Sequence, residues 1–206
     1  AGRPPGRLKV FNIIRPILME MLTPEEGRTV VRLARSAIEK TLSGERAVLP
    51  DLPAVFREKR GVFVTIKRQG HLRGCIGLPY PIKPLGEAVV EAAISAALED
   101  PRFPPVSRSE VAGIDLEVTV LTEPRPLDCP PDERPGCVEV GRHGLIVSGH
   151  GTGGLLLPQV PAEYGWTSRE FLDQTCIKAG LPPGCWKRGS VAVLTFEGQI
   201  FDEKAV

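Results

Sequence analysis

The sequence feature that most restricts the fold of this chain is a strand pattern that turns back on itself. Aliphatic residues occupy every second position of Val62–Ile66, which is the period of a β-strand with one buried face. Arg68-Gln69-Gly70 then predicts a turn, and His71–Ile76 returns as the second arm of a hairpin. A sheet that contains this hairpin is antiparallel at this point.

The rest of the chain supplies further strand patterns with turn residues between them. A second hairpin is predicted from Val138–Val140 and Leu145–Val147, joined through Gly141–Gly144. Because the strands come largely as hairpins, we expect an antiparallel or mixed sheet rather than a doubly wound one. Single strands are predicted at three more places: Ile114–Leu121, Leu155–Leu157 as a short buried strand, and Ser190–Phe196 as the closing strand.

Three helices accompany these strands. Thr23-Pro24-Glu25-Glu26 predicts a helix start with a capping box, and apolar residues follow at helical spacing. The Ala-rich segment Pro84–Leu98 suits a helix packed closely on a sheet, and Asp100-Pro101 ends it. A second capping box at Thr167–Glu170 begins a helix that runs to Gly180. The predicted fold class is therefore α+β, with helices packed on the sheet.

A chain of 206 residues suits one large domain or two small lobes, and it can bury roughly 70% of its unfolded surface. Residues 1–20 are expected to form a tail and a lead-in segment. Ala1–Arg7 has no apolar face to bury, which predicts a mobile tail, and folded structure is expected to begin within Leu8–Met21. Pro124–Gly136 is dense in Pro and Gly, which fits either a crossing between two lobes or a long surface loop.

The charge balance and the hydropathy argue against two classes of partner. Lys and Arg number 26 and Asp and Glu number 25, so the formal charge is +1 and no global field favours nucleic acid. No apolar run approaches the roughly 20 residues that a membrane-spanning helix needs. The N-terminus lacks the pattern of a signal peptide. We therefore expect a cytoplasmic protein without a nucleic-acid or membrane partner.

Five cysteines without any CxxC spacing disfavour a secreted disulfide framework and a structural zinc site, and no metal site is predicted. Reduced thiols are the default in a cytoplasmic protein. Cys129 with Cys137, or Cys176 with Cys185, would form disulfides in an organism that tolerates them inside the cell, as some hyperthermophiles do.

Leu72-Arg73-Gly74-Cys75-Ile76-Gly77 is the segment that we expect to centre the functional surface. Two glycines flank a thiol, and Arg73 would lower the thiol pKa, which is the setting of a reactive cysteine. The alternative is a buried Cys in a hairpin with Gly at a bulge, favoured about two to one on burial statistics. His71 is a candidate general base, but it would lie about 13 Å from Cys75 along an extended strand. His143 and His150 are the other candidate bases, and both are expected to be solvated loop residues.

Other segments with chemically interesting residues have structural explanations. Gly149–Gly154 matches the GxGxxG pattern, but a strand rather than a helix follows, so we interpret it as a flexible loop, with anion cradling as the alternative. Asp100–Pro105 fits a rigid helix stop, or a site in which prolines preorganise Asp100 and Arg102. Glu117 is predicted on the strand face opposite Leu116, where it faces water or a site. Lys178 and Trp186 fit an ordinary helix end.

Four segments in order resemble the AMMECR-one family: Leu72–Gly77, Asp100–Pro105, Leu155–Val160 and Lys178–Leu181. The resemblance covers almost all of the chain from about residue 20 to residue 203. It implies one AMMECR-type domain over residues 21–203, built from two intimately packed subdomains. It implies no particular biochemical activity, and neither it nor the residues identify a cofactor. Bacterial relatives are associated with a Memo-like protein and a radical-SAM protein, so it also implies partners in such a pathway.

We weigh two functions for such a protein. The first is a binding or accessory module, in which the Cys75 turn and a strand at Leu155–Val160 form a cleft for a small molecule or protein partner. The alternative is an enzyme or enzyme subunit that uses Cys75 as nucleophile or redox thiol, with Arg73 stabilising charge. The expected binding residues are Leu72, Arg73, Gly74, Cys75, Ile76, Gly77, Asp100, Arg102, Glu117 and Gln159, of which Cys75 and Arg73 are the candidate catalytic residues.

Overall fold

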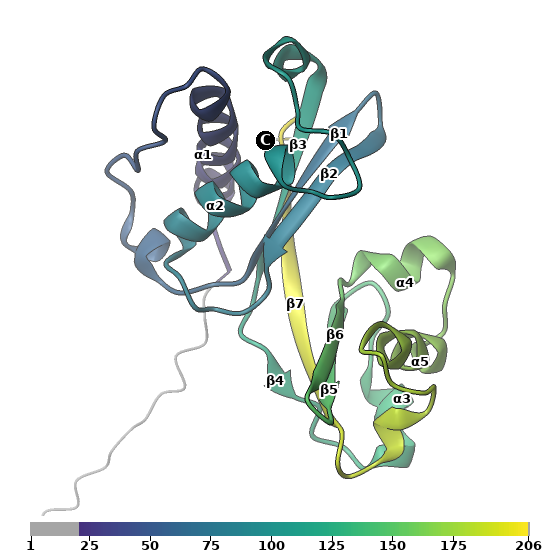
Figure 1. Ribbon diagram of the computed structural model, residues 1–206. Coiled ribbons are helices and arrows are strands. Elements are labelled where there is room, and N and C mark those ends of the chain that lie inside the picture. The colour runs from purple at the N-terminus through teal and green to yellow at the C-terminus, as the bar shows by residue number, and fades with distance from the viewer. Residues whose placement is uncertain (1–20, 206) are drawn as a thin grey trace, which may run out of the picture.

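The computed structural model describes residues 21–205 and contains an antiparallel sheet of seven strands with helices on its faces (Figure 1). The strand order is β2-β1-β3-β7-β5-β6, and β4 pairs with β7 beside this path. The predicted α+β class is confirmed. The strands are β1 (Val62–Arg68), β2 (His71–Leu78), β3 (Ile114–Leu121), β4 (Arg125–Pro126), β5 (His143–Gly149), β6 (Thr152–Leu156) and β7 (Ala192–Asp202).

The helices that the capping boxes predict are present. Thr23 caps α1 and Thr167 caps α5, and in both helices the Glu three residues later completes the box. Short 3₁₀ turns fill several connections: η1 (Ala54–Arg57), η2 (Arg108–Gly113), η3 (Pro131–Glu133) and η4 (Cys185–Lys187). The α-helices are α1 (Pro24–Leu42), α2 (Leu85–Leu98), α3 (Arg134–Cys137), α4 (Gln159–Tyr164) and α5 (Ser168–Lys178).

The molecule has two main hydrophobic clusters that share one sheet. In the first cluster α1 and α2 cover one face of β1, β2 and β3, and the Ala-rich face of α2 lets it lie close to the strands. In the second, α5 and η4 pack on β5 and β6 around Phe171 and Trp186. β7, yellow in Figure 1, runs through both parts, because its first half pairs with β5 and its second half with β3.

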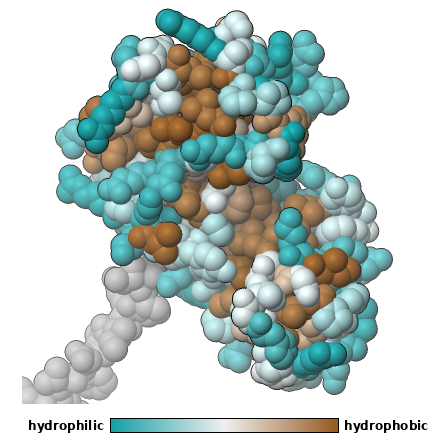
Figure 2. Space-filling model, viewed as in Figure 1, coloured by the Kyte–Doolittle hydropathy of each residue, from teal (hydrophilic) through white to brown (hydrophobic). Residues whose placement is uncertain are grey.

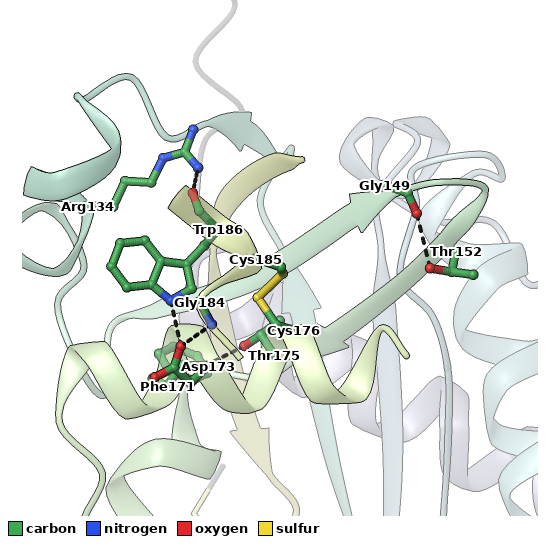
Figure 3. The surroundings of a disulfide bond; sticks show 10 residues. All are labelled: Arg134, Gly149, Thr152, Phe171, Asp173, Thr175, Cys176, Gly184, Cys185 and Trp186. Carbon is green, nitrogen blue, oxygen red and sulfur yellow. Dashed lines mark hydrogen bonds between the residues drawn. A yellow bond between two sulfur atoms is a disulfide. The ribbon is translucent and has the colours of Figure 1, made fainter. Parts of the chain in front are cut away.

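A disulfide joins the end of α5 to η4 within the second cluster (Figure 3). It links Cys176 and Cys185, whereas Cys75, Cys129 and Cys137 are free thiols. Beside it, Asp173 Oδ1 accepts hydrogen bonds from the indole Nε1 of Trp186 and from the backbone N–H of Gly184, both at 2.7 Å. These contacts hold η4 against α5.

The predicted second hairpin is wrong. Val138–Val140 forms no strand; instead the amide of Glu139 donates to His143 Nδ1 at 3.0 Å, and the amide of His143 donates back to the Glu139 carbonyl at 2.9 Å. The backbone N–H groups of Glu139 and His143 are therefore bonded within this turn and are not free to pair as a hairpin. β5 pairs instead with β6 through a tight turn at His150 and Gly151, which have φ of 53° and 79°. The flexible loop predicted at Gly149–Gly154 is therefore also wrong.

The strand predicted through Leu155–Val160 is correct only in its first part. β6 ends at Leu156, and α4 begins at Gln159. Leu155 and Leu157 are half-buried rather than fully buried. The closing strand begins near the predicted place and continues six residues beyond Phe196, to Asp202.

Two further expectations concern the ends and the surface of the chain. Residues 1–20 lie outside the described residues, so the predicted tail and lead-in segment stay predictions. Pro124–Gly136 contains β4, η3 and the start of α3, and it connects β3 to the part of the chain around α5. Within residues 21–205 no helix has the length and apolar character required to cross a bilayer.

Candidate functional site

β2, which carries the Cys75 segment, lies at one edge of the sheet. It pairs with β1, so that Cys75 lies opposite Thr65 and Gly77 lies opposite Phe63. The register shifts between Ile66 and Lys67, because Arg73 is an extra residue on β2. Such a bulge turns the strand locally and redirects a side chain.

The two glycines of the segment are required by close contacts. A Cβ on Gly74 would lie 2.2 Å from the carbonyl oxygen of Ala96, so the backbone of α2 approaches the strand at this point. A Cβ on Gly77 would lie 2.3 Å from a ring carbon of Phe63, whose side chain therefore occupies that space. Both glycines act by allowing packing, and no phosphate or nucleotide is needed to explain them.

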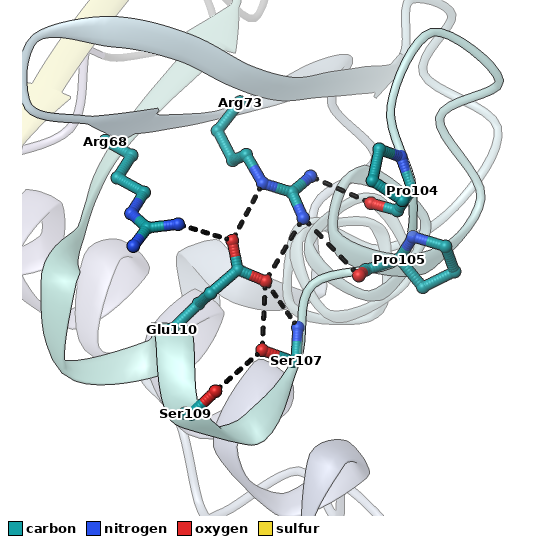
Figure 4. Close-up of polar contacts among 7 residues, drawn as sticks. All are labelled: Arg68, Arg73, Pro104, Pro105, Ser107, Ser109 and Glu110. Atoms are coloured by element: carbon teal, nitrogen blue, oxygen red, sulfur yellow. Dashed lines mark hydrogen bonds and ion pairs between the residues drawn. The ribbon is translucent and has the colours of Figure 1, made fainter.

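Arg73 is directed toward η2 and the proline-rich segment that precedes it (Figure 4). Its guanidinium bonds Glu110 with Nε–Oε1 of 3.1 Å and donates to the Pro104 carbonyl at 2.9 Å. Arg73 is the main reason that the pKa of Glu110 falls to about 2, and the backbone amide of Ser107 adds to the effect. Arg73 therefore ties β2 to this segment, and this geometry gives no support to the idea that it activates the thiol.

Asp100 and Arg102 cover the outer backbone edge of β2 at Cys75. Asp100 Oδ2 accepts from the Cys75 amide at 2.8 Å, and Arg102 Nη2 donates to the Cys75 carbonyl at 3.1 Å. The two side chains also bond each other, at 2.9 and 2.7 Å. The Arg102 guanidinium holds the pKa of the buried Asp100 carboxyl well below its usual range. The pair satisfies the backbone groups that a neighbouring strand would otherwise bond.

The Cys75 thiol is packed rather than activated. Its Sγ lies 3.2 Å from Thr65 Oγ1, and burial raises the pKa of the thiol above its ordinary value, although Thr65 and Arg102 counteract part of that effect. His71 lies at the hairpin end of β2, opposite Arg68. A raised pKa leaves the thiol protonated at neutral pH, which is unfavourable for a nucleophile.

The side chain of Cys75 lies on the sheet face opposite α1 and α2, which we call the open face. Glu117 is on this face as predicted, since its neighbours Leu116 and Val118 are buried under the helices. Glu117 Oε2 accepts from Lys67 Nζ at 2.7 Å, which raises the pKa of that ammonium group. The open face is defined by Phe63, Thr65, Lys67, Cys75, Glu117 and Thr119, which follow from the strand registers.

α4 begins beside the open face. Pro158, the residue before α4, lies 3.8 Å from the position of a Cβ on Gly198, next to Thr119, and Glu163 contributes to the raised pKa of Lys67. Phe63 packs with Leu155 and other residues of a third small cluster between the two main ones. In Figure 2 apolar residues gather where the upper and lower parts of the molecule meet. Gln159 Oε1 is buried without a hydrogen-bond partner among the described residues.

The structure brings some of the predicted site residues together and separates others. Cys75, Asp100 and Arg102 are in direct contact, and Glu117 lies in the same cross-strand row as Cys75, with Thr65 between them. The remaining predicted residues lie apart from the thiol: Leu72 is exposed, Arg73 bonds Glu110 of η2, Gly74 faces α2, Ile76 packs on the first cluster, Gly77 lies under Phe63, and Gln159 starts α4.

The sequence interpretation missed Thr65, Lys67 and Glu110. Alternation along β1 places Thr65 and Lys67 on one face, and this could be predicted from the sequence. Which strands lie beside β1 could not be predicted in the same way. Glu110 has no local signal beyond the Ser107 capping box. Among residues 21–205, cavities open beside α1, α2, η2 and β4, and Cys75 lines none of these cavities. Residues 21–205 hold no cluster of three or more potential metal ligands.

Comparison with known proteins gives consistent matches over nearly the whole chain. The family model AMMECR1 matches residues 31–201. A protein of Methanothermobacter thermautotrophicus is 55% identical over 185 residues, covering 88% of this chain and 96% of its own. A protein of Methanosarcina acetivorans is 53% identical over 189 residues, covering 89% and 94%. The crystal structure of an uncharacterized protein from Pyrococcus horikoshii is similar, with a TM-score of 0.83, 50% identity, and coverage of 88% and 93%.

Proposed function

This chain belongs to the AMMECR1 family, and we propose that it acts as a binding module whose small-molecule ligand rests on the open face beside Cys75. The observation that supports this proposal is that the residues around Cys75 make contacts that fix the position of β2. Arg73 bonds Glu110, the glycines admit α2 and Phe63, and Asp100 with Arg102 covers the strand edge. These contacts build a rigid platform, and rigid strands position binding groups well.

The open face offers groups that suit recognition of a small polar molecule. The ammonium of Lys67 and the carboxylate of Glu117 bond each other, and each group can also bond a ligand. Thr65 adds a hydroxyl group. Phe63 supplies an apolar surface on the same face. The buried carbonyl oxygen of Gln159, which has no partner in the described part of the chain, is a further acceptor at the start of α4. Ligand sites commonly combine a few such polar groups with apolar walls.

The alternative of a thiol enzyme has less support from the same contacts. A nucleophilic cysteine needs a lowered pKa or an adjacent base. Burial raises the pKa of Cys75, and its hydrogen-bond partner is the hydroxyl of Thr65. We therefore favour binding over covalent chemistry.

Thiol alkylation by iodoacetamide, followed by mass spectrometry from pH 6 to pH 9, distinguishes these two functions. We expect Cys75 to react more slowly than the exposed Cys137 at every pH, because its thiol is buried and its pKa is raised. If Cys75 instead reacted faster than the other thiols near neutral pH, the result would contradict the binding proposal and favour a thiol enzyme.

A thermal-shift screen of a metabolite library tests binding itself. A ligand of the open face should raise Tm in the wild type and in Cys75→Ser, and should lose this effect in Lys67→Gln. Lys83→Gln is the matched control, because Lys83 also pairs with a glutamate, Glu91, and is exposed to a similar degree, 40% against 36%. Hits that survive Lys67→Gln unchanged would place the ligand elsewhere. A screen without hits, combined with a stable complex with a protein partner that Lys67→Gln abolishes, would assign the open face to that partner instead.

A further inference from the structure

A cavity of about 290 Å³ lies on the opposite side of the molecule from the open face, between α1, α2 and the loop that follows α1. Leu33 and Ala37 of α1 are buried at its floor, and Val90 of α2 is half-buried beside them. Val48 and Leu52 of the loop close the other wall. In Figure 2 apolar side chains gather over this part of the molecule, bordered by hydrophilic ones.

The loop wall is anchored on both sides. A Cβ on Gly86 would lie 3.1 Å from Leu52 and 3.4 Å from Leu49, so the loop packs against the first turn of α2. The loop runs on into η1, whose Phe56 is buried in the first cluster. The cavity is therefore bounded by packed residues and is not a gap beside a free loop.

The charges around the cavity have one sign. Its lining includes Arg32 and Lys40 but no carboxylate. Arg32 shares its charge with Glu25, which accepts from Arg32 Nη2 at 3.2 Å. Among residues 21–205, neither the ammonium of Lys40 nor the hydroxyl of Ser36 has a side-chain hydrogen bond or ion pair. These two residues are one helical turn apart and face the cavity together.

We propose that this cavity binds an amphipathic monoanion, an alkyl carboxylate of medium length. The carboxylate would accept from Lys40 Nζ and Ser36 Oγ, and the alkyl chain would lie between Leu33, Val90 and the loop. Apolar pockets of about 300 Å³ and above hold small ligands in many proteins, and this cavity is at the lower end of that range. A neighbouring hollow on the other side of the loop is lined by Glu87, Glu91 and Glu99, so the anion preference is specific to the first cavity.

This site is separate from the open face, because α1 and α2 lie between the cavity and the sheet. Binding here neither requires nor excludes a ligand beside Cys75. The two proposals therefore fail independently: Lys67→Gln should leave the cavity intact, and changes in the cavity should leave the open face intact.

Calorimetric titration with octanoate, octanol and octylammonium tests the charge preference in the full chain. We expect octanoate to bind at least about tenfold more tightly than octanol, because only the carboxylate gains charge-assisted hydrogen bonds. Octylammonium should bind least, because Arg32 and Lys40 repel it. Equal affinity for octanoate and octylammonium, or no binding of octanoate, would overturn the proposal.

Substitutions locate the binding site. Lys40→Gln should weaken octanoate binding about five- to tenfold and leave octanol binding unchanged. Lys178→Gln is the matched control, since Lys178 is the basic residue in the last turn of α5 as Lys40 is in α1.

Val90→Phe should fill the cavity and abolish binding of all three compounds. If that variant fails to fold, Val48→Asp is the alternative, because this side chain is 64% exposed. Its carboxylate brings a repelling charge to the cavity mouth and should weaken octanoate binding more than octanol binding. Octanoate affinity unaffected by Lys40→Gln and Val48→Asp would place it elsewhere.

Discussion

At the scale of single residues, Asp100 and Arg102 bond the backbone of the edge strand β2 at Cys75. The carboxylate accepts from the Cys75 amide while the guanidinium donates to its carbonyl, so together they replace one residue of a neighbouring strand. An uncovered edge strand invites pairing with another chain. This contact joins Asp100–Pro105 to Leu72–Gly77 in the folded chain.

The ion pair of Asp100 predicts a pH-dependent stability. The pKa of Asp100 is lowered in the folded state, so its contribution is present above the unfolded value of about 4 and is lost as the pH falls through the folded pKa. Asp100→Asn should therefore lower the free energy of unfolding by about 1–3 kcal/mol at pH 7. Urea denaturation should show this difference shrinking below about pH 4. Asp128→Asn, on an exposed residue, is the control and should change little at either pH.

Gly74 gives a prediction about packing. A methyl group at this position meets the backbone of Ala96 at 2.2 Å, and a backbone cannot rotate away as a side chain can. Gly74→Ala should lower the free energy of unfolding by about 1–3 kcal/mol or more in denaturant titrations. Gly113→Ala is the matched control, because nothing lies within 4 Å of its Cβ position. Equal stability of the two variants would mean that α2 shifts without cost.

At the scale of elements, the hairpin of β5 and β6 depends on a two-residue turn. His150 and Gly151 both have positive φ, which is the conformation of a turn that favours Asn-Gly. Glycine, and occasionally asparagine, are the residues that adopt this conformation routinely. The turn fixes the register that places Gly154 against the end of α5, where a Cβ would lie 2.4 Å from the Ala179 amide nitrogen.

The turn predicts opposite effects of two substitutions at one position. His150→Asn should raise the free energy of unfolding by a few tenths of a kcal/mol to about 1 kcal/mol, because asparagine populates the left-handed region more readily. His150→Val should lower it by about 1 kcal/mol, since a β-branched residue is strained there. Thermal unfolding of the pair checks both signs. A loss of stability in both variants would show that the imidazole itself makes a needed contact.

At the scale of the whole molecule, β7 joins two hydrophobic clusters that otherwise share few elements. Its Val193 lies in the second cluster and its Phe201 in the first, while Phe196 lies in the small cluster between them. Because one continuous strand supplies hydrogen bonds to both sides, loss of either cluster removes a pairing partner from the other. The division into two subdomains stays a prediction, and under it both subdomains would share β7.

The shared strand predicts cooperative unfolding. Both tryptophans lie with the second cluster, whereas α1 and α2 are the longest helices and dominate far-UV circular dichroism. In guanidinium titrations we expect the fluorescence and dichroism midpoints to coincide. Phe196→Ala, which should cost about 3–5 kcal/mol, should shift both midpoints together. Two separate transitions would instead show that the two hydrophobic clusters unfold independently.

The sequence by itself determined the elements whose signals are local. The capping boxes at Thr23 and Thr167, the alternation along β1 and the Ala-rich pattern of α2 specify their own conformations, and they indicated the α+β class. The family resemblance rested on the four ordered segments Leu72–Gly77, Asp100–Pro105, Leu155–Val160 and Lys178–Leu181. These signals depend on neighbours within a few residues, which is why they could be read without a structure.

Only the tertiary structure decided which distant groups meet. Arg73 bonds Glu110 across 37 residues, and Asp100 bonds the Cys75 amide across 25. Periodicity specifies which face a side chain takes, but the partner on that face depends on strand order and on how closely α2 approaches the sheet. The pairing of β5 with β6 likewise depended on a turn at His150 that carries no Asn-Gly signal. The Cys75 segment was therefore located from the sequence, while its chemistry followed from the contacts that burial and pairing impose on it.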